Sequence, residues 1–192
     1  MTDVTNLAAD VTDFTSNVFL VTGDRTVLVD AGANFDVVSR VASRVDGLDA
    51  VVLTHTHRDH VGNIDAVREA FGVETWGYDP SHPAVDHEFG ETVRLGDDDF
   101  SVLHTPGHKN DHVCLYAPTQ EVCFAGDLVF ANGAFGRTDL EEGDRRTLIR
   151  SIDRLLNAVD PTLAALHTGH GPSVTTDAYA TVERAGQAAR QW

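Results

Sequence analysis

Seven consecutive residues, Thr54 to His60, read THTHRDH, and no other run restricts the fold of this chain as strongly. They follow directly on the largely apolar residues 49–53, which are typical of a buried strand. Histidine and aspartate side chains are costly to bury unless they are paired or bind a metal. Because functional side chains can project from the loop at a strand end, the run predicts a metal site there rather than a polar surface turn.

Three later segments supply similar groups, each after an apolar run. HTPGH ends at His108, FAGD ends at Asp127 and HTGH ends at His170. A glycine beside each candidate lets the backbone turn sharply, so that the side chain can enter a shared site. Any one segment alone would more simply be a polar residue in a turn. Together with THTHRDH they predict a centre for zinc or a similar cation, which neutral imidazole and carboxylate from several loops can bind.

The composition fits one soluble domain, residues 1–192, with 42% apolar content to form a core. The two cysteines, Cys114 and Cys123, lie in apolar runs and are expected to be buried, reduced thiols. No apolar stretch approaches the ~20 residues that span a bilayer, and the polar start lacks a signal-peptide pattern. We therefore expect a cytoplasmic protein.

The net charge of −16 argues against nucleic acid or an anionic membrane as a partner. Lys109 is the only lysine, and aspartate is abundant in loops such as GDDD at 96–99. A dense carboxylate surface keeps a protein soluble where high ionic strength screens its self-repulsion. The balance therefore favours a halophilic protein, the alternative being an ordinary acidic one.

Hydrophobic patterns predict strands and helices in mixed order, arranged as two packed sheets with helices outside. A β-hairpin is expected at 17–32, with its turn at 22–25. Further strands are expected at 49–55, 73–78, 91–95, 100–105, 112–117, 121–126 and 163–169. Helices are expected at 35–45, at 63–71 with a stop at Gly72, at 144–159 with Asp144 as the cap, and from about 177 onward.

THTHRDH resembles the HxHxDH signature of the metallo-β-lactamase superfamily, and the match runs in order along nearly the whole chain. Asp30 in LVDAG resembles the first motif of the family. The segments TPGH at His108, FAGD at Asp127 and GHGP at His170 resemble the third, fourth and fifth. The resemblance implies a mixed α/β fold, an αββα four-layer sandwich with its site at one edge of the two sheets.

The resemblance also implies a role for each residue. Asp30 would orient a metal-bound imidazole, with a polar strand cap as the alternative. His112 falls where relatives often have a supporting histidine, with strand filler as the alternative. We expect two divalent ions, zinc in the first place, with iron or a mixed iron–zinc pair as alternatives. Their ligands would be His55, His57 and His108 for the first ion, Asp59, His60 and His170 for the second, and Asp127 as the bridge.

Within the superfamily, the segment 126–144, with GRTD at 136–139, is more similar to the glyoxalase II-like and persulfide dioxygenase-like branches. Arg137 would bind a substrate carboxylate or pair within the scaffold. Lys109 would attract an anionic substrate or remain exposed and solvated. The larger glyoxalase II enzymes carry a helical extension after their last metal histidine, whereas about twenty residues follow His170 here. Recognition of a long thiol carrier would therefore differ.

The leading hypothesis is a hydrolase in which two metals share a water of lowered pKa, and its hydroxide attacks a thioester carbonyl. Asp59 and Asp127 would orient that hydroxide, and the expected substrate is a 2-hydroxyacyl thioester of a small thiol. The alternative is a persulfide dioxygenase with one iron on His55, His108 and Asp127. A lactonase and a non-catalytic module are less favoured. Two other branches are disfavoured. Flavodiiron relatives usually place a glutamate where His57 stands, and nuclease relatives generally carry an added domain, for which this chain has no room.

Overall fold

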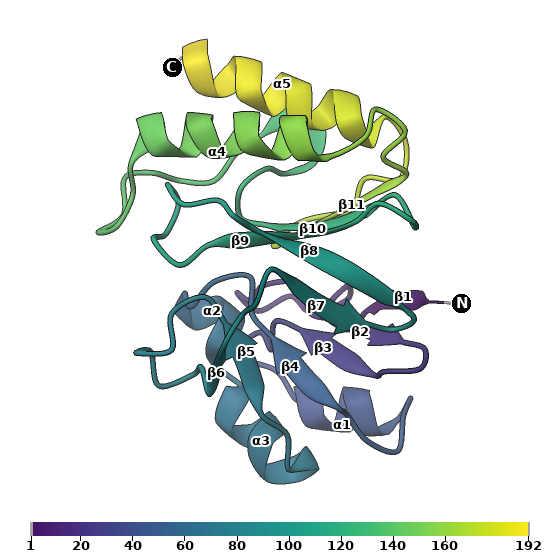
Figure 1. The fold of residues 1–192 in the computed structure, drawn as a ribbon. Coiled ribbons are helices and arrows are strands. Elements are labelled where there is room, and N and C mark those ends of the chain that lie inside the picture. Colours follow the sequence, from purple (N-terminus) through teal and green to yellow (C-terminus); the bar gives the residue numbers. More distant parts are fainter. Residues whose placement is uncertain (1, 192) are drawn as a thin grey trace. The chain divides into compact units, whose positions relative to one another are not determined.

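A computed structural model describes residues 2–191, which form two compact units that divide between Asp99 and Phe100 (Figure 1). Each unit has its own sheet and its own helices. The prediction of a mixed α/β chain with two sheets is therefore confirmed. The single domain predicted for residues 1–192 stays a prediction.

The sheet of the first unit has six strands that are hydrogen-bonded in chain order. The pairs β1–β2 and β2–β3 are antiparallel, and the pairs β3–β4, β4–β5 and β5–β6 are parallel. The strands are β1 (Asp3–Asn6), β2 (Phe19–Thr22), β3 (Val27–Val29), β4 (Ala50–Val52), β5 (Thr75–Gly77) and β6 (His87–Glu88). The helices are α1 (Val37–Ala42), α2 (Arg58–Val61) and α3 (Ile64–Phe71), and β7 (Thr92–Leu95) follows them in the chain.

One face of this sheet packs against α1 and α3, because alternate strand residues point toward the helices. Leu28 and Val51 from the strands cluster with Val41 and Val67 from the helices, and all four are at most 1% exposed. The helix α3 ends where predicted, at Gly72, which adopts the left-handed conformation with φ 64°. This apolar layer fixes the carboxyl ends of the parallel strands.

The second sheet has five strands in the order β11-β10-β9-β8-β7, in which β8–β9 and β9–β10 are antiparallel and β10–β11 is parallel. The helices α4 and α5 lie on one side of it (Figure 1) and share its apolar core, to which Leu148, Ile152 and Val182 contribute. The elements that follow β7 in the chain are β8 (Asp98–His104), β9 (Val113–Ala117), β10 (Val122–Gly126), η1 (Ala131–Gly133), α4 (Arg145–Ala158), β11 (Ala165–Thr168) and α5 (Ala178–Gln191).

Most predicted elements are present, including α4, whose cap Asp144 accepts a hydrogen bond from the Thr147 N–H. The helix expected at 35–45 is shorter: Asp36 caps it, and after Ala42 the chain continues in single turns. The strand β1 was not predicted, because its residues are largely polar; it pairs with β2 through its backbone. The short elements β6, α2 and η1 were also not predicted.

Both cysteines are fully buried and unoxidised, as predicted. Cys114 lies in β9 and Cys123 in β10, where they belong to the apolar cluster under α4. The hydrogen bond with the Cys114 thiol, and then burial, raise the pKa of Cys123, so this thiol stays protonated. Among residues 2–191, no helix is both long and apolar enough to cross a bilayer.

Candidate metal centre

The first group of site residues lies where β3 and β4 end. These strands are parallel neighbours, so their carboxyl ends meet at the same edge of the sheet. Asp30 directly follows β3, and its N–H donates to the Val52 carbonyl at the end of β4 over 2.9 Å. The loop after β4 carries Thr54 and His55, both buried, and leads into α2. The backbone thus brings Asp30 beside THTHRDH although 23 positions separate it from Leu53.

The Asp30 carboxylate accepts three hydrogen bonds, each of 2.8 Å. They come from the Thr54 N–H, the Thr54 hydroxyl and Nδ1 of His60. Asp30 is 3% exposed and His60 is fully buried. Because a carboxylate only accepts, Nδ1 of His60 carries the proton, and in the neutral ring Nε2 keeps the lone pair that binds a metal. Asp30 therefore orients His60, as the resemblance implies.

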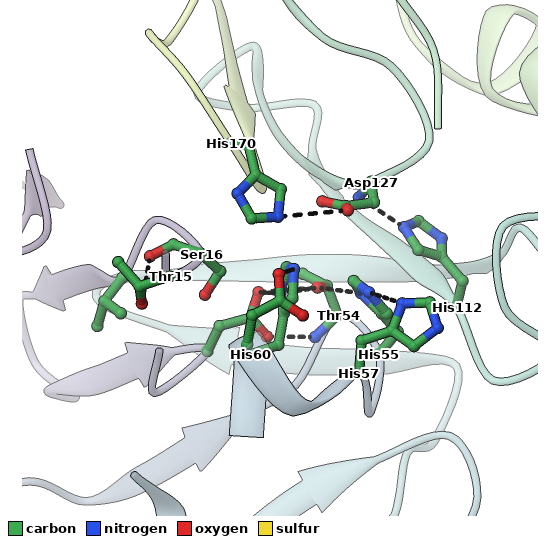
Figure 2. A network of polar contacts seen from close by, with 12 residues as sticks. Thr15, Ser16, Thr54, His55, His57, His60, His112, Asp127 and His170 are labelled. Atoms are coloured by element: carbon green, nitrogen blue, oxygen red, sulfur yellow. Dashed lines mark hydrogen bonds and ion pairs between the residues drawn. The ribbon is translucent and has the colours of Figure 1, made fainter. Parts of the chain in front are cut away.

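The other donors of THTHRDH gather around His60 (Figure 2). Nε2 of His55 lies 3.1 Å from Nδ1 of His57, and the rings of His55 and His60 are 3.9 Å apart between centroids. Helix α2 starts after His57 and turns Asp59 toward the same place, with its Oδ2 3.9 Å from Nε2 of His60. Four potential ligands are therefore concentrated in one turn of chain.

The second group lies where β10 and β11 end, again a parallel pair with adjacent carboxyl ends. Asp127 follows β10, and His170 follows β11, with the Gly169 N–H donating to the Gly126 carbonyl over 2.7 Å. Nε2 of His170 lies 3.5 Å from Oδ2 of Asp127, and Figure 2 shows the two side chains facing one another. His108, from the loop before β9, places its Nε2 3.4 Å from the same oxygen.

These spacings fit atoms that share a metal ion. Two atoms bound to one tetrahedral zinc at 2.0–2.1 Å lie about 3.3 Å from each other. The distances from Oδ2 of Asp127 to His108 and His170 are only slightly longer. His108 and Asp127 are 4% and 5% exposed, so their polar atoms are largely removed from water. Imidazole and carboxylate are also the donor types that zinc and iron accept, so the residues fit a bound metal.

Two of these candidate ligands, His108 and Asp127, are fixed by hydrogen bonds to other parts of the second unit. Nδ1 of His108 donates to the Arg137 carbonyl over 2.8 Å, which leaves Nε2 for a metal. The Asp127 N–H donates to Nε2 of His112 over 3.0 Å, and Nδ1 of His112 lies 2.8 Å from the Thr105 hydroxyl. Both nitrogens of His112 are thus engaged in the scaffold. His112 positions the Asp127 backbone and is not itself a metal ligand.

Two predicted substrate-binding residues have partners in the scaffold. The Arg137 guanidinium forms a two-pronged pair with Asp139, at 2.9 and 2.8 Å, and both side chains are 69% exposed. This pair raises the pKa of Arg137 and lowers that of Asp139. The Lys109 ammonium lies 2.7 Å from Glu142, and its side chain is only 14% exposed. The alternative of an exposed, solvated lysine is therefore wrong, because this ion pair holds the side chain against the protein.

Sequence reasoning missed several supporting groups: the hydroxyls of Thr54 and Thr105, the Arg137 carbonyl and the Glu142 carboxylate. The two threonines are the first residues of THTHRDH and TPGH, just after β4 and β8, and that position was an available signal. No signal existed for the carbonyl, because every residue has one. Glu142 lies 33 positions from Lys109 and becomes its partner only through the fold.

The family model for the metallo-β-lactamase superfamily matches residues 11–170, and the chain belongs to this superfamily of metal-dependent hydrolases. Hydroxyacylglutathione hydrolase GloC of Haemophilus influenzae is 31% identical, over 86% of this chain and 90% of that protein. The protein TTHA1623, solved in a di-iron-bound form, is 32% identical with a TM-score of 0.72, over 86% of this chain and 92% of its own.

A third similar protein, ETHE1 from Myxococcus xanthus, has a TM-score of 0.74 at 22% identity, over 100% of this chain and 90% of its own. At that identity the likeness shows the fold alone. The predicted family and its fold are therefore confirmed, and relatives of the glyoxalase II-like branch are among the similar proteins.

Proposed function

We propose that this protein hydrolyses a thioester of the hydroxyacyl-thiol type with two bound metal ions. The observation that carries the proposal is which ring nitrogen His60 and His108 leave available for a metal. Nδ1 of His60 is committed to Asp30, and Nδ1 of His108 is committed to the Arg137 carbonyl. Both rings therefore present Nε2 beside a carboxylate, which is how metal-binding histidines are prepared. The similarity to GloC along most of both chains supports the substrate class.

We assign the ligands as the family pattern implies. Asp127 would contribute to both ion sites, since Nε2 of His108 and Nε2 of His170 are both near its Oδ2. We further propose zinc as the metal, with iron in one or both positions as the alternative, because nitrogen and oxygen donors suit both. The two sets are His55, His57 and His108 for the first ion, and Asp59, His60 and His170 for the second.

Bound divalent ions supply a water that is nucleophilic at neutral pH and polarise a carbonyl group. In our proposal the carboxylates of Asp59 and Asp127 accept hydrogen bonds from that water and direct its lone pair toward the thioester carbon. The C–S bond then breaks, and the products are a carboxylate and a thiol. Arg137 remains a candidate for binding a substrate carboxylate, and it would have to leave Asp139 to do so.

The test is an assay of metal-loaded protein against thioesters of small thiols, with a lactone and a β-lactam as comparisons. We expect hydrolysis of 2-hydroxyacyl thioesters, two metals per chain by element analysis, and at least a ~10³-fold loss of kcat for Asp127→Asn, because both the metals and the water depend on it. Protein with two metals that hydrolyses none of the panel would overturn the proposal.

The same preparation tests the persulfide dioxygenase alternative in an oxygen electrode. Our proposal requires no oxygen uptake with a persulfide substrate, whereas a dioxygenase would consume oxygen with one iron per chain. We propose the cytoplasm as the setting and a small-molecule thioester as the substrate, with neither nucleic acid nor a membrane as a partner, in keeping with the acidic composition.

A further inference from the structure

The loop that carries His108 is fastened to a single later segment of the second unit, residues 136–144. The Gly107 carbonyl accepts a hydrogen bond from the Asp144 N–H over 2.8 Å. Nδ1 of His108 donates to the Arg137 carbonyl over 2.8 Å. The next two residues, Lys109 and Asn110, both contact Glu142. Four successive residues of the loop are therefore attached to the same segment.

Glu142 provides the side-chain part of this attachment. Its Oε1 lies 2.7 Å from the Lys109 ammonium, and its Oε2 accepts the Asn110 N–H over 3.1 Å. The Asp144 N–H holds Gly107, just before His108, and the Glu142 carboxylate holds Lys109 and Asn110, just after it. The Lys109 and Glu142 side chains are 14% and 36% exposed, so water screens this pair less than a fully exposed one.

The loop needs such a contact because it has little regular structure of its own. It lies between β8 and β9, and Gly107 has φ 128°, a conformation open to glycine. A Cβ at Gly107 would lie 2.2 Å from the Leu148 nitrogen, so the loop runs directly against α4. Asp111, 5% exposed, adds a second carboxylate 3.6 Å from the Lys109 ammonium. Lys109 is thus held between two acidic groups.

We propose that Glu142 is a positioning residue for the metal ligand His108, acting through Lys109 and the Asn110 N–H. The inference rests on the proposed function in that His108 binds a metal there. Glu142 contacts Lys109 and Asn110, the two residues that follow His108, and through them it fixes the backbone on which His108 stands. It also gives the single lysine of the chain a role other than attracting an anionic substrate.

The chain offers a matched control in the neighbouring residue Glu141. This side chain is exposed, and within residues 2–191 it forms no hydrogen bond or ion pair. Glu141→Gln and Glu142→Gln remove the same charge from adjacent positions of one loop. Any general effect of charge is therefore equal in the two variants. Only Glu142→Gln breaks the contacts of Glu142 with Lys109 and Asn110, which we call the clamp on the His108 loop.

The experiment measures zinc affinity by competition with a chromophoric chelator, together with the visible spectrum of the cobalt-substituted protein. We expect Glu142→Gln to bind zinc about ten-fold more weakly than wild type, the usual cost of losing an outer support of a ligand. Its cobalt spectrum should shift, because the His108 geometry changes. Glu141→Gln should match wild type in both. Equal affinities and spectra for the two variants would overturn the proposal.

Two further variants test the proposal in case Glu142→Gln folds poorly. Lys109→Met keeps the hydrogen bond to the Asn110 N–H, so we expect a smaller loss of zinc affinity. The double variant with Glu142→Gln should lose no more than Glu142→Gln alone, because the two residues act as one unit. Losses that simply add would show that Lys109 and Glu142 act independently, and would overturn the clamp.

Hydrogen exchange of the Asn110 amide in metal-free protein separates this proposal from the function. We expect about ten-fold faster exchange in Glu142→Gln than in Glu141→Gln, because a charge-assisted hydrogen bond is lost. If wild type binds zinc but hydrolyses no thioester, the proposed function is wrong, and the zinc affinities of the variants still test the role of Glu142. If wild type binds no metal, the function fails and Asn110 exchange alone decides the loop contact. Unchanged exchange would refute that contact in either case.

Discussion

The backbone N–H of Asp127 donates to Nε2 of His112 over 3.0 Å, so a buried histidine accepts from the very residue proposed to bridge two metals. Because Nε2 accepts, the neutral ring carries its proton on Nδ1, which faces the Thr105 hydroxyl at 2.8 Å. The ring can serve both neighbours only as this neutral tautomer. His112 therefore links the end of β8 to the start of the loop after β10.

Replacing His112 with alanine should disturb the backbone of Asp127 while removing none of the proposed ligand side chains. The Asp127 N–H would lose its acceptor inside the protein, at a cost of roughly 1–3 kcal/mol in the free energy of unfolding. Zinc affinity should fall ~10- to 100-fold. Chemical denaturation and chelator competition measure the two effects. His87→Ala, at an exposed histidine of β6, is the control, and a His112 variant no weaker in zinc binding than this control would disprove the positioning role.

Asp30→Asn tests the support of His60. Asp30 has φ 58°, which asparagine tolerates, so the backbone should not change. An amide has only one oxygen, so it cannot accept all three hydrogen bonds that the carboxylate accepts from Thr54 and His60. We expect one of the two metals to be lost preferentially, seen as about one ion per chain by element analysis after dialysis. Retention of both ions at wild-type affinity would contradict the role of Asp30.

His167 should make the protein sensitive to mild acid. Burial lowers its pKa from 6.5 to about 4, and its ring stacks on Phe124 with centroids 5.0 Å apart. The folded state thus binds this proton less readily than the unfolded state does. The resulting stability is present above pH 6.5 and is lost as pH falls toward 4, roughly 2 kcal/mol between pH 7 and pH 5.

His167→Phe, which keeps an aromatic ring on Phe124, should remove this part of the pH dependence. Urea denaturation of both proteins at pH 7 and pH 5 measures it. The variant should lose about 2 kcal/mol less than wild type between the two pH values. Carboxyl groups titrate in both proteins and cancel in the comparison. Parallel losses in the two proteins would show that His167 is not the acid-sensitive group.

Salt dependence tests the proposed halophilic character. With 30 acidic and 14 basic residues, self-repulsion should destabilise the folded chain in dilute buffer. We expect the melting temperature to rise by several degrees between 0.1 M and 2 M potassium chloride, where the Debye length shrinks from about 10 Å to below 3 Å. Sodium sulfate at equal ionic strength separates screening from general salting-out. A protein already at full stability in 0.1 M salt would be an ordinary acidic one.

The sequence by itself determined the types and order of the candidate metal donors, and most of the strands and helices. Its signals are local: an apolar run followed by THTHRDH, a Gly at 72 that stops a helix, an Asp at 144 that caps one. It failed where pairing is made by the backbone, as in β1, because a polar strand has no apolar pattern to reveal it.

Only the tertiary structure decided which nitrogen His60 and His108 leave available and which groups hold the other. Nδ1 of His60 meets Asp30 from 30 positions away, and Lys109 meets Glu142 from 33 positions away. These partners are carboxylates among many in an acidic chain, so composition cannot select them. Which one is close enough to bond depends on parallel strands ending together and on the loop after β8 lying against α4. Hydrogen bonds act over about 3 Å, and only the fold sets distances on that scale.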